Sequence, residues 1–241
     1  MSIAEKLNTI ANNQSKVYDA GKKAEHDDFW DNNQDYGNRE DYTRGYNGNG
    51  KCWNKYNFYP KHAMRPTLAE YMFYAWEDAE TQDLNLTQRL IDCNAPLDTS
   101  NATQMSAMFA YGKFTSIPTI DLTSCISGKS AQLFQSCPYL VTIEKIKMHK
   151  DIVATNWFRY DSNLENLEIE GEIGQNGFNV KDCKKLTQKS LLSILKALYL
   201  GITETKTITF SIEHQKIIET DAECKPYWES AKQAGWSFVY A

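Results

Sequence analysis

The sequence predicts an α/β protein whose centre is a short, irregular repeat solenoid, preceded by an N-terminal helix and closed by a C-terminal α/β cap. Three observations predict this class. Residues 3–24 carry a seven-residue apolar rhythm, three segments between residues 108 and 171 align at a stride of about two dozen residues, and residues 186–241 alternate helical and strand patterns. We therefore divide the chain into an N-terminal oligomerisation helix (1–30), a polar, aromatic-rich connector with an N-terminal cap (31–66), the solenoid (67–185) and the C-terminal cap (186–241).

Composition argues against several classes of function. The 241 residues carry a net charge of −5 without any block of Lys and Arg, so we expect no nucleic-acid partner. No apolar run reaches the roughly 18 residues that would span a membrane, and the first residues lack the basic and apolar regions of a signal peptide. We expect synthesis in the cytoplasm and no membrane partner. The six cysteines form no Cys-x-x-Cys pair, which favours reduced, mostly buried thiols.

The N-terminal helix has the pattern of a helix-to-helix seam. Ile3, Ile10 and Val17 are seven residues apart, and Leu7 lies four residues after the first of them. This narrow stripe predicts homo-oligomerisation through the helix. The alternative is that the helix packs back on its own domain, and sedimentation of the full chain against a chain that starts near Phe29 would distinguish the two.

The connector is rich in Asn, Asp, Gly and Tyr, which predicts turns and a domain boundary. Its aromatic side chains are candidates for ligand contact, with Tyr42, Tyr46, Trp53 and Tyr56 as the chosen residues. The alternative is that these rings form the core of an N-terminal cap, because an exposed solenoid end must be covered.

The repeat is the main evidence for the fold. Three apolar columns recur at strides of 24 to 26 residues, and the predicted repeat core consists of Phe109, Phe134, Phe158, Leu140, Leu164, Ile117, Ile143 and Leu167. A unit of this length cannot bury its own hydrophobic face, so neighbouring units must stack into a common interior. The strand part of each unit should point Ile117, Ile120 and Leu122, or their counterparts, inward. A further unit around residues 72–75 carries an insertion with a short helix near Leu84–Asp92.

The motifs Phe134-x-x-Cys137-x-x-Leu140-x-x-Ile143 and Phe158-x-x-Asp161-x-x-Leu164-x-x-Leu167 resemble the BspA-like class of bacterial leucine-rich repeats. The first unit departs from this motif by a one-residue deletion. The resemblance therefore implies a short, irregular leucine-rich-repeat solenoid.

The whole chain is also similar to a group of uncharacterised proteins from bacterial genomes and prophages that begin with a helix. The chain shares with them two stretches of its opening, Ala4-Glu5-Lys6-Leu7 and residues 17–25. It also shares the ending Gly235-Trp236 and the apolar residues that follow it. This similarity implies an association with phage structural proteins and brings no catalytic residues.

The C-terminal region predicts a helix over residues 186–200, capped by Thr187 or Ser190 and ended by Gly201. A β-branched strand over Thr205–Ile212 should follow. A second helix over 221–234 with Pro226 in its first turn, and a closing strand over 236–240 that pairs beside residues 207–210, complete the cap. We interpret this region as the seal of the solenoid's apolar end.

Motifs of chemistry are missing. The four histidines have no partner at metal-binding spacing, and no nucleophile elbow or phosphate-binding loop occurs. We therefore expect no enzyme, cofactor or metal, but a binding or structural-interaction protein that presents a repeat surface to a protein or carbohydrate ligand, in a phage tail or at a cell surface. The alternatives are an intracellular protein-binding adaptor of bacterial origin and a hydrolase with an unrecognised site.

Overall fold

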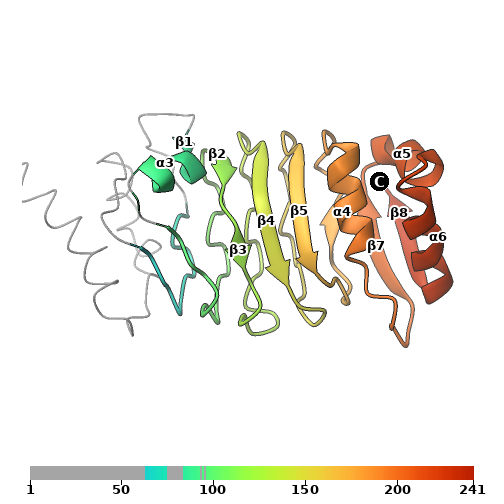
Figure 1. Ribbon diagram of the computed structural model, residues 1–241, viewed down its shortest axis with the longest axis horizontal. Helices are drawn as coiled ribbons and strands as arrows, with labels where there is room; N and C mark the ends of the chain where they lie inside the picture. Colours follow the sequence, from blue (N-terminus) through green and yellow to red (C-terminus); the bar gives the residue numbers. More distant parts are fainter. Residues whose placement is uncertain (1–62, 75–83, 93, 95) are drawn as a thin grey trace, which may run out of the picture.

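The computed structural model describes residues 63–74, 84–92, 94 and 96–241 (Figure 1). This part of the chain is an α/β structure that combines helices with two parallel sheets. Its elements follow one another along the long axis in sequence order, so that β2, β4, β5 and α4 lie side by side (Figure 1). The predicted N-terminal helix and the connector up to residue 62 lie outside the described residues.

The first sheet is parallel throughout and has the strand order β1-β2-β4-β3. In it β2 and β3 pair with successive stretches of β4, and β5 pairs with β4 on the opposite edge. Its strands are β1 (Leu84–Asn85), β2 (Phe114–Ile117), β3 (Ile120–Asp121), β4 (Thr142–Met148) and β5 (Asn166–Gly171). Ile117 is opposite Ile143, and Ile143 is opposite Leu167. The stride predicted from the sequence is therefore the register of the sheet.

Two local features interrupt this sheet. Pro118 separates β2 from β3, because proline has no N–H to contribute to a ladder. On the other side, β4 has one residue more than β5 between the paired positions Ile143/Leu167 and Ile146/Ile169, which makes a β-bulge. The inward positions are still kept, since Ile143, Ile146 and Met148 are all buried.

The opposite side of the core is made of consecutive turns whose backbones also pair in parallel. Phe109 N–H donates to the Leu133 carbonyl at 2.9 Å, and Phe134 N–H donates to the Trp157 carbonyl at 3.2 Å. The rings form a column, with centroids 5.6 Å apart for Phe109–Phe134 and again for Phe134–Phe158, and planes within 13° of parallel. Phe73 extends the column on one side and Phe178 on the other.

The turns use left-handed backbone at residues that are not glycine. One column contains Tyr71, Ala107, Gln132 and Asn156, with φ between 52° and 59°, and a second contains Tyr111, Ser136 and Tyr160, with φ of 62°, 60° and 70°. The two columns flank the phenylalanines, because each left-handed residue lies two positions before or after a Phe. Tight turns of this kind let alternate N–H groups reach the next segment.

The predicted insertion helix is α3 (Leu86–Asp92). Asn85 caps it, since its side-chain oxygen accepts the N–H of Gln88 at 2.9 Å. Leu86 and Leu90 are buried on its inner side. The helix therefore packs beside the start of the first sheet, where it contacts β2.

The helix α4 (Gln188–Lys196) takes the place of the next strand at the free edge of β5. Two serine side chains replace the missing backbone partners. The Ser190 hydroxyl accepts the Leu167 N–H at 2.9 Å and donates to the Glu165 carbonyl at 2.8 Å, while the Ser193 hydroxyl accepts the Ile169 N–H at 2.9 Å. The helix thus satisfies a sheet edge that would otherwise be open to pairing with another chain.

The predicted bounds of this helix were wrong at its C-terminal end. Thr187 is the N-cap, as one of the two predicted options, but the helix ends at Lys196 and not before Gly201. Residues 197–199 turn into extended chain because they pair with the preceding segment: Ile173 N–H donates to the Ala197 carbonyl and Tyr199 N–H donates to the Ile173 carbonyl. Pairing with the neighbouring segment prevails over local helical periodicity.

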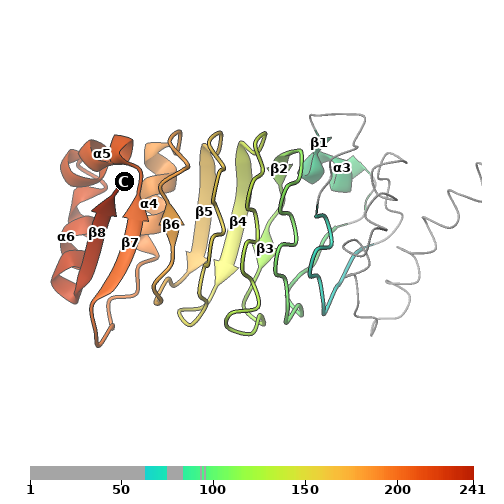
Figure 2. The same ribbon diagram turned by 180° about the vertical axis from the view of Figure 1, so that it is seen from behind.

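The second sheet has the order β6-β7-β8 and is also parallel (Figure 2). It consists of β6 (Asn179–Val180), β7 (Lys206–Phe210) and β8 (Trp236–Tyr240). The predicted pairing of the closing strand beside residues 207–210 is confirmed. The predicted strand over Thr205–Ile212 is shorter at both ends, because Ser211 begins the 3₁₀ turn η2 (Ile212–His214).

Two helices connect β7 to β8. The helix α5 (Gln215–Thr220) was not predicted, and α6 (Lys225–Ala234) starts four residues later than expected, with Pro226 in its first turn. The delay has a local cause: the Asp221 carboxylate accepts the N–H groups of Glu223 and Cys224 and holds residues 221–224 in a turn. Gly235, at φ 108°, ends α6.

Candidate binding surfaces

The predicted site residues divide into two sets. All eight residues of the predicted repeat core are buried and belong to one continuous hydrophobic cluster. The predicted ligand contacts Tyr42, Tyr46, Trp53 and Tyr56 and the predicted oligomerisation residues Ile3, Leu7, Ile10 and Val17 lie outside the described residues. The described surface therefore has to be analysed by its own geometry.

The outward side of β4 and β5 carries a charge network. The Lys145 ammonium lies 2.8 Å from Glu170 and 3.0 Å from Glu168, and Lys147 lies 3.9 Å from Glu170. The hydrogen bond from Lys145 holds the pKa of Glu170 below its usual range, and Glu170 in turn raises the pKa of Lys145. Exposed ion pairs contribute little to stability. The main effect of the network is therefore to hold these charged side chains in place on the outward side of β4 and β5.

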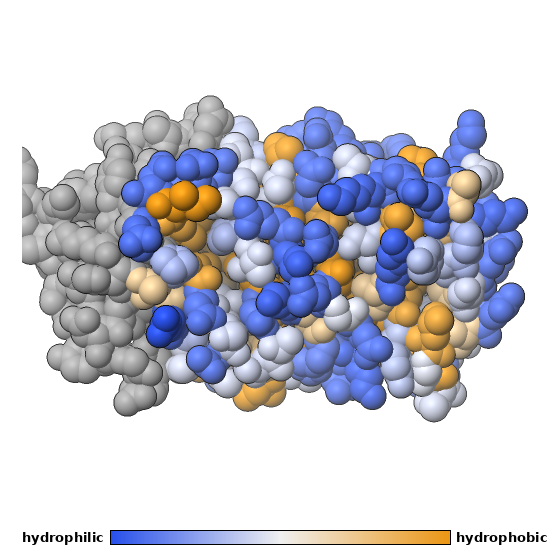
Figure 3. Space-filling model, in the orientation of Figure 1, coloured by the Kyte–Doolittle hydropathy of each residue, from blue (hydrophilic) through white to orange (hydrophobic). Residues whose placement is uncertain are grey.

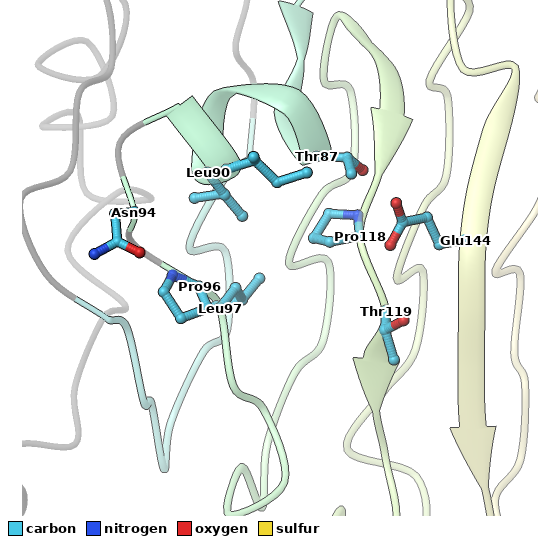
Figure 4. Close-up of a pocket in the computed structure, with 9 residues that line it drawn as sticks. Thr87, Leu90, Asn94, Pro96, Leu97, Pro118, Thr119 and Glu144 are labelled. Atoms are coloured by element: carbon cyan, nitrogen blue, oxygen red, sulfur yellow. The ribbon is translucent and has the colours of Figure 1, made fainter.

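A pocket with a volume of about 390 Å³ adjoins this network (Figure 4). It lies where α3 and the segment after it stand away from the strands. Its residues are Thr87, Leu90, Ile91, Asn94, Pro96, Leu97, Pro118, Thr119 and Glu144. Figure 4 shows Leu90 and Leu97 on one side and the Glu144 carboxylate beside Pro118 on the other.

The pocket combines an apolar wall with one carboxylate. Glu144 is exposed and stands on the bulged part of β4, while Thr87 and Thr119 supply hydroxyl groups. Ile91, 65% exposed, adds apolar surface over α3, where Figure 3 shows a hydrophobic patch beside otherwise hydrophilic strands. This arrangement suits a small apolar group that carries a cation or a hydrogen-bond donor. Among its described lining residues Glu144 is the single titratable side chain, so these residues provide no pair of groups for acid–base catalysis.

Three buried titratable groups lie in the column next to the phenylalanines: Cys137, Asp161 and Cys183. Burial raises the pKa of the Cys137 and Cys183 thiols and of the Asp161 carboxyl well above their usual values. The Cys137 thiol donates to the Phe109 carbonyl at 3.1 Å, and Asp161 Oδ1 accepts the Cys137 N–H at 2.8 Å. A thiol that is buried and protonated is a poor nucleophile. What these groups do is connect neighbouring segments through their hydrogen bonds.

The described histidines form no site. His149 lies 3.8 Å from Asp151 at the surface, and His214 is buried with neither ring nitrogen hydrogen-bonded. Within the described ranges, no three His, Cys, Asp or Glu side chains are placed to hold a metal ion. None of the helices in the described part of the chain has the length and apolar character needed to cross a bilayer.

One exposed feature, a set of tyrosines in the loops before the strands, was not predicted from the sequence. Tyr111, Tyr139 and Tyr160 are 41%, 37% and 55% exposed, in the loops that lead into β2, β4 and β5. The repeat alignment could have placed two of them at the same position of the repeat, since Tyr111 and Tyr160 are both two residues after a core phenylalanine.

Comparisons with protein-family models, with curated proteins and with solved structures found no match for this chain.

Proposed function

We propose that this chain is a non-catalytic binding module built as a short leucine-rich-repeat solenoid of the BspA-like type. The parallel register of residues 114–117, 142–148 and 166–171, together with the ring column of Phe109, Phe134 and Phe158, supports the solenoid. Each segment buries the apolar face of its neighbour, as stacked repeats do.

A deletion series tests the solenoid. Removing residues 135–158 takes out one whole stride and joins Phe134 to Arg159, so that the remaining segments can stack as before. We expect this variant to unfold cooperatively with a smaller unfolding enthalpy. Removing residues 135–146, half a stride, should abolish the cooperative transition. Equal behaviour of the two deletions in calorimetry would contradict the proposal.

We assign the binding role to the strand side, which is the outward side of β4 and β5, and to the pocket beside it. Outward side chains stand at regular spacing on a rigid ladder, next to an apolar hollow with a single carboxylate, Glu144. The reactive side chains of the described core are buried, and burial raises the pKa of the Cys137 thiol and of the Asp161 carboxyl. A surface that is ordered and chemically unreactive is suited to recognition of a protein or a glycan by contact, with the ligand released unchanged.

Binding to peptide and glycan arrays, followed by surface variants, tests this role. Glu144→Lys should weaken binding of a strand-side ligand at least tenfold, while Lys129→Glu, at an exposed loop position away from the pocket, should leave it unchanged. A bound ligand should be recovered chemically intact after incubation. Turnover of the ligand would refute the proposal, and a peptide or neutral glycan whose binding is unaffected by Glu144→Lys would refute the strand-side pocket as its site.

We propose further that the helix over residues 1–30 joins copies of the chain. The seven-residue spacing of Ile3, Ile10 and Val17 supports this. Sedimentation of the full chain and of the Leu7→Asp variant should give an oligomer and a monomer, respectively, and a monomeric wild-type chain would refute it.

A further inference from the structure

The loops that lead into the strands form a continuous edge of the molecule, at the top of Figure 1. Side chains connect the successive loops. Gln135 donates to the Tyr111 hydroxyl at 3.0 Å, Asn163 donates to the Pro138 carbonyl at 2.6 Å, and Lys185 donates to Asn163 at 2.8 Å. We call this edge, with Tyr111, Gln135, Tyr139, Arg159, Tyr160, Asn163 and Lys185, the tyrosine corner.

The backbone at the tyrosine corner does not favour tyrosine. Tyr111 and Tyr160 have φ of 62° and 70°, a left-handed conformation that bulky side chains rarely adopt and that Gly and Asn adopt more readily. Ser136 has the same conformation in the segment between them, so a ring is not required by the turn. Tyr160 is 55% exposed and contributes little to the core. Outliers of this kind concentrate at functional surfaces.

The corner also carries the cationic side chains of Arg159 and Lys185, on a chain whose net charge is −5, beside one carboxylate, Asp182, which accepts the Tyr160 N–H at 2.9 Å. The Arg159 guanidinium lies over the Tyr160 ring at 4.7 Å and donates to its hydroxyl at 2.7 Å. Within the part of the chain that the structure describes, Arg159, Lys181 and Lys185 form no ion pair with a carboxylate. Their charge is therefore directed to solvent or to a partner.

We propose that the tyrosine corner binds an acidic oligosaccharide, which deepens and rests on the proposed binding function. Exposed tyrosine rings offer flat apolar surfaces for the C–H faces of sugar rings. The Asn163 amide can bond hydroxyl groups, and Arg159 and Lys185 match carboxylates, while the buried Gln135 holds the Tyr111 hydroxyl in place. A protein interface would have a contiguous apolar centre, whereas here polar groups separate the rings.

The experiment uses two probes with the same backbone: oligogalacturonate, and the same oligosaccharide with its carboxylates methyl-esterified. We expect the full chain to bind the acid form and to bind the ester at least tenfold more weakly, with an affinity for the acid that falls as salt rises. Equal binding of acid and ester would overturn the proposal, because recognition would then not involve the carboxylates.

Variants separate a binding role of the ring from a structural one. Tyr160→Asn should leave the melting temperature unchanged or higher, since Asn tolerates the left-handed backbone, yet weaken oligogalacturonate binding at least tenfold. Tyr227→Asn is the matched control, at a tyrosine that is 41% exposed on α6, and should bind normally. Unchanged binding by the Tyr160 variant, or a loss of stability with binding retained, would overturn the proposal.

The proposal and the general binding function fail in different ways. If the chain binds a peptide or a neutral glycan, Glu144→Lys abolishes that binding and oligogalacturonate does not bind, the binding function stands and the tyrosine corner is refuted. If no probe binds, neither acid nor ester nor any array ligand, both are refuted.

Discussion

Asp161 offers the sharpest test of how the core is assembled. Its side chain is fully buried, Oδ1 accepts the Cys137 N–H, and Oδ2 has no hydrogen-bond partner within the described residues. Burial raises the pKa of this carboxyl well above its ordinary value of 3.8, although the bond from Cys137 lowers it in part. Substituting Asp161→Asn keeps the shape and the acceptor oxygen while removing the group that can ionise.

The direction of the pH effect follows from linkage. Because the pKa is higher in the folded state than in the unfolded state, the stability contributed by Asp161 is fully present below about pH 4 and is lost as pH rises toward the folded-state pKa. In this range the free energy of unfolding of the wild type should fall, relative to that of Asp161→Asn, by up to about 1.4 kcal/mol for each pH unit.

Urea unfolding at intervals between pH 3.5 and 8, followed by tryptophan fluorescence, measures this difference. Subtracting the two curves removes the contributions of all carboxyls that the substitution leaves unchanged. Glu172→Gln is the control, because Glu172 is exposed and forms no ion pair within the described residues. A difference curve for Asp161→Asn no steeper than that of this control would refute the claim that burial governs this carboxyl.

Three further predictions concern stability in denaturant. Phe134→Ala, in the middle of the ring column, should cost about 3–5 kcal/mol, and a cost under about 1 kcal/mol would argue against a tightly packed column. Gln132→Gly should raise the free energy of unfolding by about 0.5–1 kcal/mol, because φ there is 59°, whereas Ala131→Gly, outside the left-handed set, should lower it. Ser190→Ala should cost about 1–3 kcal/mol, since it leaves the Leu167 N–H unpaired at the edge of β5; a neutral result would mean that water replaces the hydroxyl.

The buried side of the fold could be predicted because its positions must be apolar and must recur at a regular spacing in the sequence. Ile117, Ile143 and Leu167 must each reach the same interior, so their spacing stays close to two dozen residues, at 26 and then 24. The N-cap of α4 could be predicted for a similar reason, since Thr187 serves a chemical need that few residue types meet.

The turn side was harder to predict because its conformations are not those that its residues prefer. A left-handed position usually indicates Gly or Asn, yet seven such positions here include Tyr, Ala, Gln and Ser. The backbone pairing between segments imposes them, and that pairing is a tertiary effect. The end of α4 was missed for the same reason, since the Ile173 backbone, and not Gly201, decides where the helix stops.

The candidate site shows what a periodic sequence can and cannot disclose about function. A stride that aligns inward residues must align outward ones too, so Tyr111, Ser136 and Tyr160 could have been placed in one column from the sequence alone. What the alignment could not supply is the backbone angle, and the angle is what distinguishes a residue kept for folding from one kept for contact. Where the turn would accept Asn or Ser at lower cost, an exposed tyrosine needs another reason for its presence. Loss of ligand without loss of stability in Tyr160→Asn would supply that reason.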